Sequence, residues 1–331
     1  MIQVENLTKR YGPTLAVSDV SFEVQKGEVL GFLGPNGAGK TTTMRILTGY
    51  LTPSNGRARV AGYDVQEEPL EAKKRTGYLP ENPPVYPDMT VKEYLAFVGR
   101  IKGVARKDLK TRIGEVAEKC AISDVFSRPI GKLSKGYRQR VGLAQAIIHN
   151  PDVLILDEPT AGLDPKQIIE TRDLIRNLAG QHTIILSTHI LPEVSRTCHR
   201  VVVINQGKVV AAGEPQELTQ RLQGFETVMV VVEGPAAEVI DKLQRVEGVN
   251  LVEPRESTDG RMTFEIHAEK GRDVRAELAR AIVESQWKLF ELKTSGMSLE
   301  DIFLKLTTKD ISEEAAVAPG PSLGEQIAGE N

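Results

Sequence analysis

The sequence predicts an α/β fold, in which a larger unit built on a parallel sheet is followed by a smaller α+β unit. Two patterns carry this prediction. In residues 1–222, short apolar runs typical of strands buried on both faces alternate with amphipathic helical segments. From about residue 225 the expected order becomes strand, helix, strand, strand, helix, strand, which is the split pattern of ferredoxin-like domains.

Composition excludes several functions. The net charge is −3, which gives no support for a nucleic-acid partner, because such a partner would favour a basic face. The longest apolar runs have the length of strands, well short of the ~20 residues that span a bilayer. If the protein serves a membrane process, another chain is expected to provide the pore. The start of the chain has no signal-peptide pattern. Cys120 and Cys198 lie far apart and are expected to be buried and reduced, as in a cytoplasmic protein.

A glycine-rich segment provides the strongest chemical signal. It follows the pattern Gly-x4-Gly-Lys-Ser/Thr between an expected strand at 28–33 and an expected helix at 43–47, which is the context of a phosphate-binding loop. Glycines let successive N–H groups point at phosphate oxygens, and the following helix adds its positive end. Lys40 supplies a point charge, and the Thr41 hydroxyl is placed to bind Mg²⁺. The expected phosphate-binding residues are Gly34, Pro35, Asn36, Gly37, Ala38, Gly39, Lys40, Thr41 and Thr42.

Two acidic residues follow an expected strand at 153–156. Asp157 can hold Mg²⁺ directly or through water, and Glu158 can orient and deprotonate an attacking water. A strand followed by Asp-Glu is by itself an ordinary solvated strand end. Its distance from the phosphate loop favours the catalytic interpretation.

A second anion site is expected at residues 133–140, which precede a helix through 144–148. Ser134 and Gly136 lie at the N-terminus of this helix, where a serine alone would be an ordinary cap. The segment follows the phosphate loop and precedes the Asp-Glu strand by about 20 residues, and this order favours phosphate binding.

In this order the motifs resemble those of the ATP-binding subunits of ABC transporters, over about residues 2–220. Residues 34–42 resemble the Walker A motif, 153–158 the Walker B motif and 133–139 the signature loop. Three single residues complete the resemblance: Asp164 in the D-loop, His189 in the switch loop, and Tyr11 where the family stacks an aromatic ring on adenine. The signature is most similar to that of the drug, polysaccharide and gliding-motility exporters.

The resemblance implies a fold and a mechanism. The core would be a P-loop NTPase with a helical subdomain at about 85–150. Two subunits, expected to be identical, would enclose ATP and Mg²⁺ between the phosphate loop of one and the signature loop of the other. Lys40, Glu158 and His189 would be catalytic. A membrane permease on a separate chain would hold the subunits at the inner face of the cell membrane.

The sequence departs from the family pattern at three positions. Glu81 occupies the Q-loop position, where many relatives carry Gln; its carboxylate still offers a hard oxygen to Mg²⁺, but it adds negative charge near the γ-phosphate of the bound nucleotide, which is tolerable only if the metal is close. Lys135 and Tyr137 stand where Gly and Gln are commoner in the signature. Lys135 either adds a cation at the nucleotide or faces solvent.

Two other classes of function are alternatives to a transporter subunit. A soluble ABC ATPase of ribosomes or DNA usually has two cassettes or a long coiled coil, and neither pattern is present. A different P-loop enzyme, such as a small-molecule kinase or GTPase, would lack the signature segment. The transported substrate and the direction of transport stay open.

The remainder of the chain contains no catalytic motif. The ferredoxin-like domain is expected at 225–308, ending in a helix at 299–306, and either regulates or stabilises a dimer or packs passively. Residues 309–331 are rich in acidic residues, Pro and Gly and are expected to be disordered.

Overall fold

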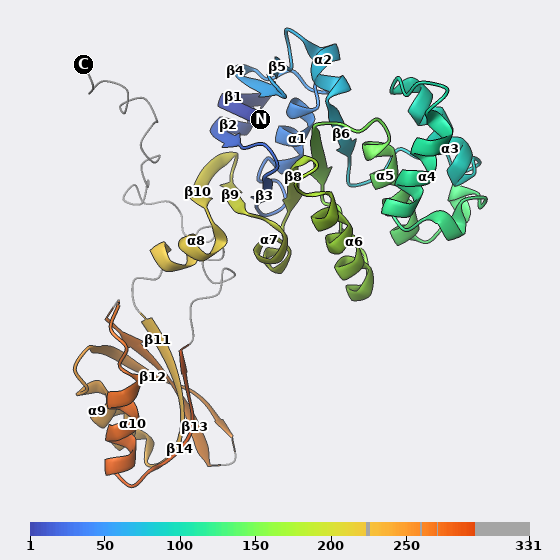
Figure 1. Ribbon diagram of the computed structural model, residues 1–331. Helices are drawn as coiled ribbons and strands as arrows, with labels where there is room; N and C mark the ends of the chain where they lie inside the picture. Colours follow the sequence, from blue (N-terminus) through green and yellow to red (C-terminus); the bar gives the residue numbers. More distant parts are fainter. Residues whose placement is uncertain (223–225, 259, 270, 295–331) are drawn as a thin grey trace, which may run out of the picture. The chain divides into compact units, whose positions relative to one another are not determined.

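The computed structural model describes residues 1–294, except 223–225, 259 and 270 (Figure 1). These residues form two compact units, the first from Met1 to Pro215 and the second beginning at Gln216. The division thus falls after the first residue of helix α8 (Pro215–Leu222), whereas the sequence analysis places it after the whole helix. The helix expected at 299–306 and the tail expected at 309–331 lie outside the described residues. No helix in the described part of the chain combines the length and the apolarity that a membrane crossing requires.

A six-stranded sheet forms the centre of the first unit, in the order β10-β9-β3-β8-β7-β6. Neighbouring strands from β9 to β6 run parallel, and β10 is antiparallel to β9. The strands are β3 (Val29–Leu33), β6 (Thr76–Leu79), β7 (Val153–Asp157), β8 (Thr183–Thr188), β9 (Arg200–Asn205) and β10 (Lys208–Gly213).

Helices cover both faces of the central strands, which explains their continuous apolar runs. Every residue of β7 is buried, and alternate residues join two different cores. Val153 and Ile155 belong to the core beside helix α1, whereas Leu154 and Leu156 belong to the core of the helical region. Each such side chain contributes roughly 1.5–3 kcal/mol on burial. The helices of this unit outside the helical region are α1 (Lys40–Leu47), α2 (Pro69–Lys74), α6 (Pro165–Leu178) and α7 (Leu191–Thr197).

The N-terminal part of the first unit is a second, antiparallel sheet in the order β2-β1-β4-β5. Its first strand alternates buried Ile2 and Val4 with exposed Gln3 and Glu5, so only one face is covered. The sequence analysis predicted the parallel sheet of this unit but did not predict this antiparallel one. The strands are β1 (Ile2–Tyr11), β2 (Thr14–Val24), β4 (Asn55–Val60) and β5 (Tyr63–Asp64).

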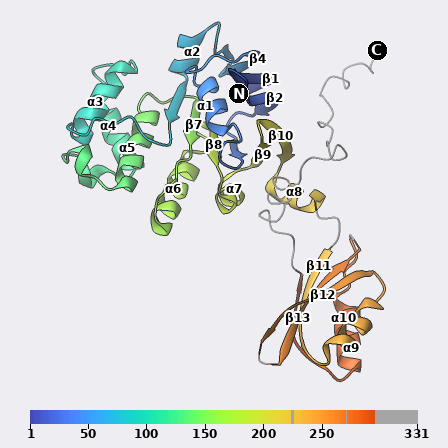
Figure 2. The same ribbon diagram turned by 180° about the vertical axis from the view of Figure 1, so that it is seen from behind.

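Three helices between β6 and β7 form the helical region, which lies to one side of the parallel sheet in both views of the first unit (Figures 1 and 2). They are α3 (Val91–Ile101), α4 (Leu109–Lys119) and α5 (Lys135–Ile147), with short 3₁₀ turns η1 (Ser123–Val125) and η2 (Ile130–Lys132). A capping box starts α3. Thr90 accepts a hydrogen bond from the backbone of Glu93, whose side chain bonds back to Thr90.

The second unit has the predicted ferredoxin-like order. An antiparallel sheet, β12-β13-β11-β14, carries two helices. Alternate residues of its central strands, including Val230 and Phe264, form a core with Leu243 and Leu278 of the helices. The elements are β11 (Glu226–Glu233), α9 (Ala236–Gln244), β12 (Val249–Thr258), β13 (Arg261–Ala268), α10 (Arg275–Glu284) and β14 (Lys288–Thr294).

His149 makes the stability of the chain dependent on pH. Its Nε2 lies 3.2 Å from the carbonyl oxygen of Thr76, and its Nδ1 is buried without a partner. Burial lowers the pKa of His149 from 6.5 to about 4, and Lys102 lowers it further by charge repulsion. Between these two values the unfolded chain binds the extra proton, so stability is lost as the pH falls from 6.5 towards 4. His149→Gln, which keeps a donor towards Thr76, should lessen this loss.

Urea unfolding of the wild type and of His149→Gln at pH 7, 6 and 5 measures the effect. As the pH falls, we expect the free energy of unfolding to decrease more in the wild type than in His149→Gln. A constant difference over this range would contradict the assignment.

Candidate nucleotide-binding site

The carboxyl ends of three adjacent parallel strands bring the candidate residues together. In the register of the sheet, Asp157 of β7 pairs with Ser187 of β8, and Leu33 of β3 pairs with Thr188 of β8. The phosphate loop, the Asp-Glu pair and the switch histidine therefore follow neighbouring strand ends at one edge of the sheet. Ligands of parallel α/β sheets bind at this edge.

Glycines shape the phosphate loop where other residues would not fit. Gly37 and Gly39 have φ values of 80° and 104°, in the left-handed region. A Cβ atom at Gly39 would lie 2.5 Å from the carbonyl oxygen of Ala16. Gly39 is also the N-cap of α1 and gives no side-chain cap, so the first N–H groups of the helix are left for a ligand.

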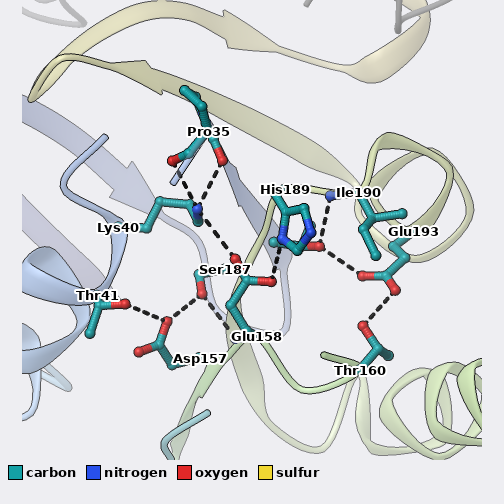
Figure 3. A network of polar contacts seen from close by, with 12 residues as sticks. Pro35, Lys40, Thr41, Asp157, Glu158, Thr160, Ser187, His189, Ile190 and Glu193 are labelled. Atoms are coloured by element: carbon teal, nitrogen blue, oxygen red, sulfur yellow. Dashed lines mark hydrogen bonds and ion pairs between the residues drawn. The ribbon is translucent and has the colours of Figure 1, made fainter. Parts of the chain in front are cut away.

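Lys40 is a buried cation between the loop and the acidic strand end (Figure 3). Its Nζ donates hydrogen bonds to the carbonyl oxygens of Gly34 at 2.8 Å and Pro35 at 3.1 Å. The same Nζ lies 3.2 Å from Oε1 of Glu158. These contacts hold the ammonium group beside the N-terminus of α1, where its charge adds to that of the helix dipole.

Glu158 and His189 form a contact pair in front of Lys40. Nδ1 of His189 lies 2.9 Å from Oε2 of Glu158, and Glu158 is 7% exposed. Glu158 has a φ of 49°, a left-handed conformation that costs a side-chain-bearing residue about 1–3 kcal/mol. Its N–H donates to Oγ of Ser187 at 3.0 Å, which helps to hold this conformation.

Asp157 lies beneath this pair with two hydroxyl groups around it. Oγ of Ser187 donates to Oδ1 of Asp157 at 2.6 Å, and Oγ1 of Thr41 donates to the same oxygen at 3.3 Å. Burial raises the pKa of Asp157, and these two hydrogen bonds oppose the rise. Thr41, Asp157 and Glu81 offer hard oxygen ligands, which suit Mg²⁺. Within the described residues no group of three or more His, Cys, Asp or Glu side chains forms a complete metal site, and Mg²⁺ commonly completes its ligands with phosphates and water.

A cavity of about 250 Å³ collects half of the predicted nucleotide-binding residues, together with Glu158 and His189. Gly34, Pro35 and Ala38 belong to the same loop but do not line the cavity. Tyr11 does not line it either; the residue is 45% exposed and the centroid of its ring lies 5.4 Å from Nζ of Lys9, so its stacking on adenine stays a prediction. The lining residues are Ala16, Asn36, Gly37, Gly39, Lys40, Thr41, Thr42, Glu81, Glu158, Ala161 and His189.

The predicted signature residues line a different cavity, of about 270 Å³, in the same unit. Ser134 caps α5 by accepting a hydrogen bond from the N–H of Tyr137 at 3.3 Å, and Asp164 caps α6 by accepting one from Gln167 at 2.9 Å. Gly136 allows α6 to approach, because a Cβ there would lie 2.7 Å from the side chain of Gln167. The residues that line this second cavity are Ser134, Gly136, Tyr137, Arg140, Asp164, Lys166, Gln167 and Glu170.

Sequence reasoning missed two groups of this site. Ser187 bonds to both acidic residues of the strand end, and Ala16 supports the loop through the close approach to Gly39. The position of Ser187 directly before Thr188 and His189 at a strand end was a usable signal for the first. The contact of Ala16 with Gly39 depends on how β2 packs, and no sequence signal indicates it.

The phosphate loop, the acidic strand end and the histidine on one sheet edge define the class of a P-loop nucleotide-binding protein. Comparison with known proteins identifies the family. Residues 17–161 match the family model described as ABC transporter. An uncharacterized ABC transporter ATP-binding protein of Bacillus subtilis, YxlF, is 37% identical over 92% of this chain and 99% of its own length. The chain therefore belongs to the family of ABC transporter ATP-binding proteins, as the sequence analysis predicted.

Two further similarities extend over large parts of the chain. The linearmycin resistance ATP-binding protein LnrL of Bacillus subtilis is 32% identical over 95% of this chain and 100% of its own length. A solved structure of an ATP-binding subunit of an ABC transporter is 29% identical, covers 67% of this chain and 92% of its own, and superimposes with a TM-score of 0.61.

Two glycines of the loop provide a matched pair of substitutions. Gly39→Ala places a Cβ atom 2.5 Å from a backbone oxygen and strains a left-handed residue, so we expect at least a tenfold loss of ATP affinity. At Gly37 a Cβ would meet no atom within 4 Å, and only the backbone strain remains. Titration with a fluorescent ATP analogue compares the two. Equal losses of affinity in both variants would contradict the steric argument.

Proposed function

We propose that this chain binds ATP with Mg²⁺, hydrolyses it, and thereby energises a membrane transporter. One observation carries the proposal: Lys40, Glu158 and His189 meet at a single cavity, with contacts of 3.2 Å and 2.9 Å to the Glu158 carboxylate. This arrangement combines a phosphate-binding cation with a base for water. Membership of the ABC transporter family supports the nucleotide and the overall process.

Binding would use the loop and the start of α1. Backbone N–H groups of residues 37–42 and the ammonium of Lys40 would hold the β and γ phosphates. Thr41 and Asp157 would bind Mg²⁺, with Glu81 as a further oxygen ligand from the loop after β6. The metal neutralises charge on the phosphates. Tyr11 would stack on the adenine ring.

Hydrolysis would use the pair formed by Glu158 and His189. Glu158 would accept a proton from water as the water oxygen bonds to the γ phosphorus. The bond from phosphorus to the bridging oxygen then breaks and ADP leaves. His189 would hold the water and the γ phosphate in place, and Lys40 would stabilise the charge that develops on the transferred group.

A complete site would need two chains. Ser134, Gly136 and Asp164 lie around a cavity separate from the phosphate loop of their own unit, so a second subunit could present them to the nucleotide. Both halves are present in one sequence, which favours a homodimer. ATP would bridge the two surfaces, and hydrolysis would release them.

The transporter itself would be a permease on a separate chain, with this subunit bound at the inner face of the cell membrane. Export is the favoured direction, because the relative LnrL carries a resistance function in its name. Copurification of a membrane protein, rather than of ribosomes, would distinguish this role from that of a soluble ATPase.

Substitution of Glu158 tests the proposed mechanism. Glu158→Gln should bind ATP and dimerise but lower kcat by about 100-fold or more, because the base is lost while Lys40 remains. Lys40→Ala should abolish ATP binding. Glu71→Gln, on the exposed ion pair with Lys74, serves as the control and should be normal. Phosphate release and equilibrium ATP binding are measured for each protein. Normal turnover by Glu158→Gln would refute the assigned base.

Glu81 tests the metal ligands. Glu81→Gln should keep nucleotide binding, because neither Lys40 nor the loop changes, but it removes a negative charge beside the metal. We expect the Mg²⁺ concentration for half-maximal hydrolysis to rise several-fold. A Mg²⁺ titration that coincides with that of the wild type would contradict this role.

A further inference from the structure

A buried carboxylate joins the two chain segments that carry Glu158 and His189. Glu193 lies on α7 and is 3% exposed. Its Oε1 accepts a hydrogen bond from the hydroxyl of Thr160 at 2.5 Å, and its Oε2 accepts one from the hydroxyl of Thr188 at 2.8 Å (Figure 3). Each carboxylate oxygen thus holds a different segment.

The two threonines lie next to the reacting groups in the chain. Thr160 follows Glu158 by two residues and is 2% exposed. Thr188 ends β8, directly before His189, and is fully buried. The hydroxyl oxygen of Thr188 also accepts the N–H of Ile190 at 3.0 Å, so His189 is fixed on both sides.

The chemistry of this contact favours rigidity. Both side-chain partners of Glu193 are hydroxyl groups, which donate to the carboxylate without neutralising it. Hydrogen bonds to an ionised acceptor are short and strong, and a buried carboxylate that loses a donor is left poorly solvated. Moving either segment away from Glu193 therefore has a high cost in free energy.

None of the three residues lines the nucleotide cavity. Glu193 cannot act on the substrate from this position, and its side-chain hydrogen bonds go to Thr160 and Thr188 and not to Lys40. Its effect must pass through the segments it joins. On the other side of these segments, Nδ1 of His189 and Oε2 of Glu158 are 2.9 Å apart.

We propose that Glu193 is a positioning residue for ATP hydrolysis, which holds Glu158 and His189 at contact distance by clamping Thr160 and Thr188. The inference rests on the proposed roles of Glu158 and His189. It assigns to α7 a part in the chemistry, beyond its packing against the sheet.

Two substitutions of Glu193 separate positioning from bulk stability. Glu193→Ala removes both contacts, and we expect kcat to fall by about tenfold or more with the KM for ATP changed by less than about twofold. Glu193→Gln keeps the length of the side chain, one acceptor for Thr188 and an amide donor for Thr160, so kcat should recover to within about threefold of the wild type. Thr76→Val, which removes a buried hydroxyl bonded to Ala72 far along the chain from these segments, is the control for stability and should keep kcat.

The double variant His189→Ala with Glu193→Ala tests the route of the effect. If Glu193 acts through the segment of His189, the double variant is no more than about threefold slower than His189→Ala alone. Fully additive losses would overturn the proposal. So would equal losses of kcat in Glu193→Ala, Glu193→Gln and Thr76→Val, which would indicate general destabilisation.

Hydrogen exchange gives a measurement that does not depend on catalysis. In Glu193→Ala, exchange should accelerate in residues 158–161 and 188–190 and stay unchanged in β12 and β13 of the second unit. Unchanged exchange in the two segments would overturn the clamp even if the protein hydrolyses ATP. Wild-type protein that shows no turnover, or normal turnover by Glu158→Gln, would refute the proposed function while the exchange result still decides on the clamp. If Glu193→Ala does not fold, Thr160→Val and Thr188→Val, which remove one contact each, take the place of Glu193→Ala in the kinetic and hydrogen-exchange measurements.

Discussion

The parallel register of β3, β8 and β7 is the constraint on which the site depends. It places Asp157 beside Ser187, and Leu33 beside Thr188, so three loops from distant parts of the sequence start at the same edge. The register is itself fixed by burial, since both faces of these strands contact apolar cores and a shift by one residue would exchange the two sets of side chains. The arrangement of the reacting groups at this edge therefore follows from the packing of the apolar side chains along the strands.

Local signals allowed much of the fold to be predicted. The glycine pattern of residues 34–42 and the βαββαβ order of the second unit both depend on residues close together in the chain. Each motif of the candidate site is also a short local pattern, and nine of the residues named from these motifs line one cavity: Asn36, Gly37, Gly39, Lys40, Thr41, Thr42, Glu81, Glu158 and His189.

The remaining features depend on contacts between distant residues, which a single sequence does not display. Ser187 and Asp157 are 30 positions apart, and only strand register makes them partners. The bond between Glu193 and Thr160 spans 33 positions, and α7 had to be placed before it could be found. The N-terminal sheet was missed because its alternating pattern was not distinguished from that of the buried parallel strands, although exposed Gln3 and Glu5 point to an open face.

The backbone conformation of Glu158 lowers the stability of the fold at a residue that is proposed to be catalytic. A glutamate with φ of 49° occupies a region that glycine or asparagine tolerates better, so the folded chain carries a local penalty of roughly 1–3 kcal/mol at the residue it can least exchange. A laboratory selection for heat resistance alone would thus tend to replace this residue early. A thermostable homologue engineered without an activity screen should be inspected here first.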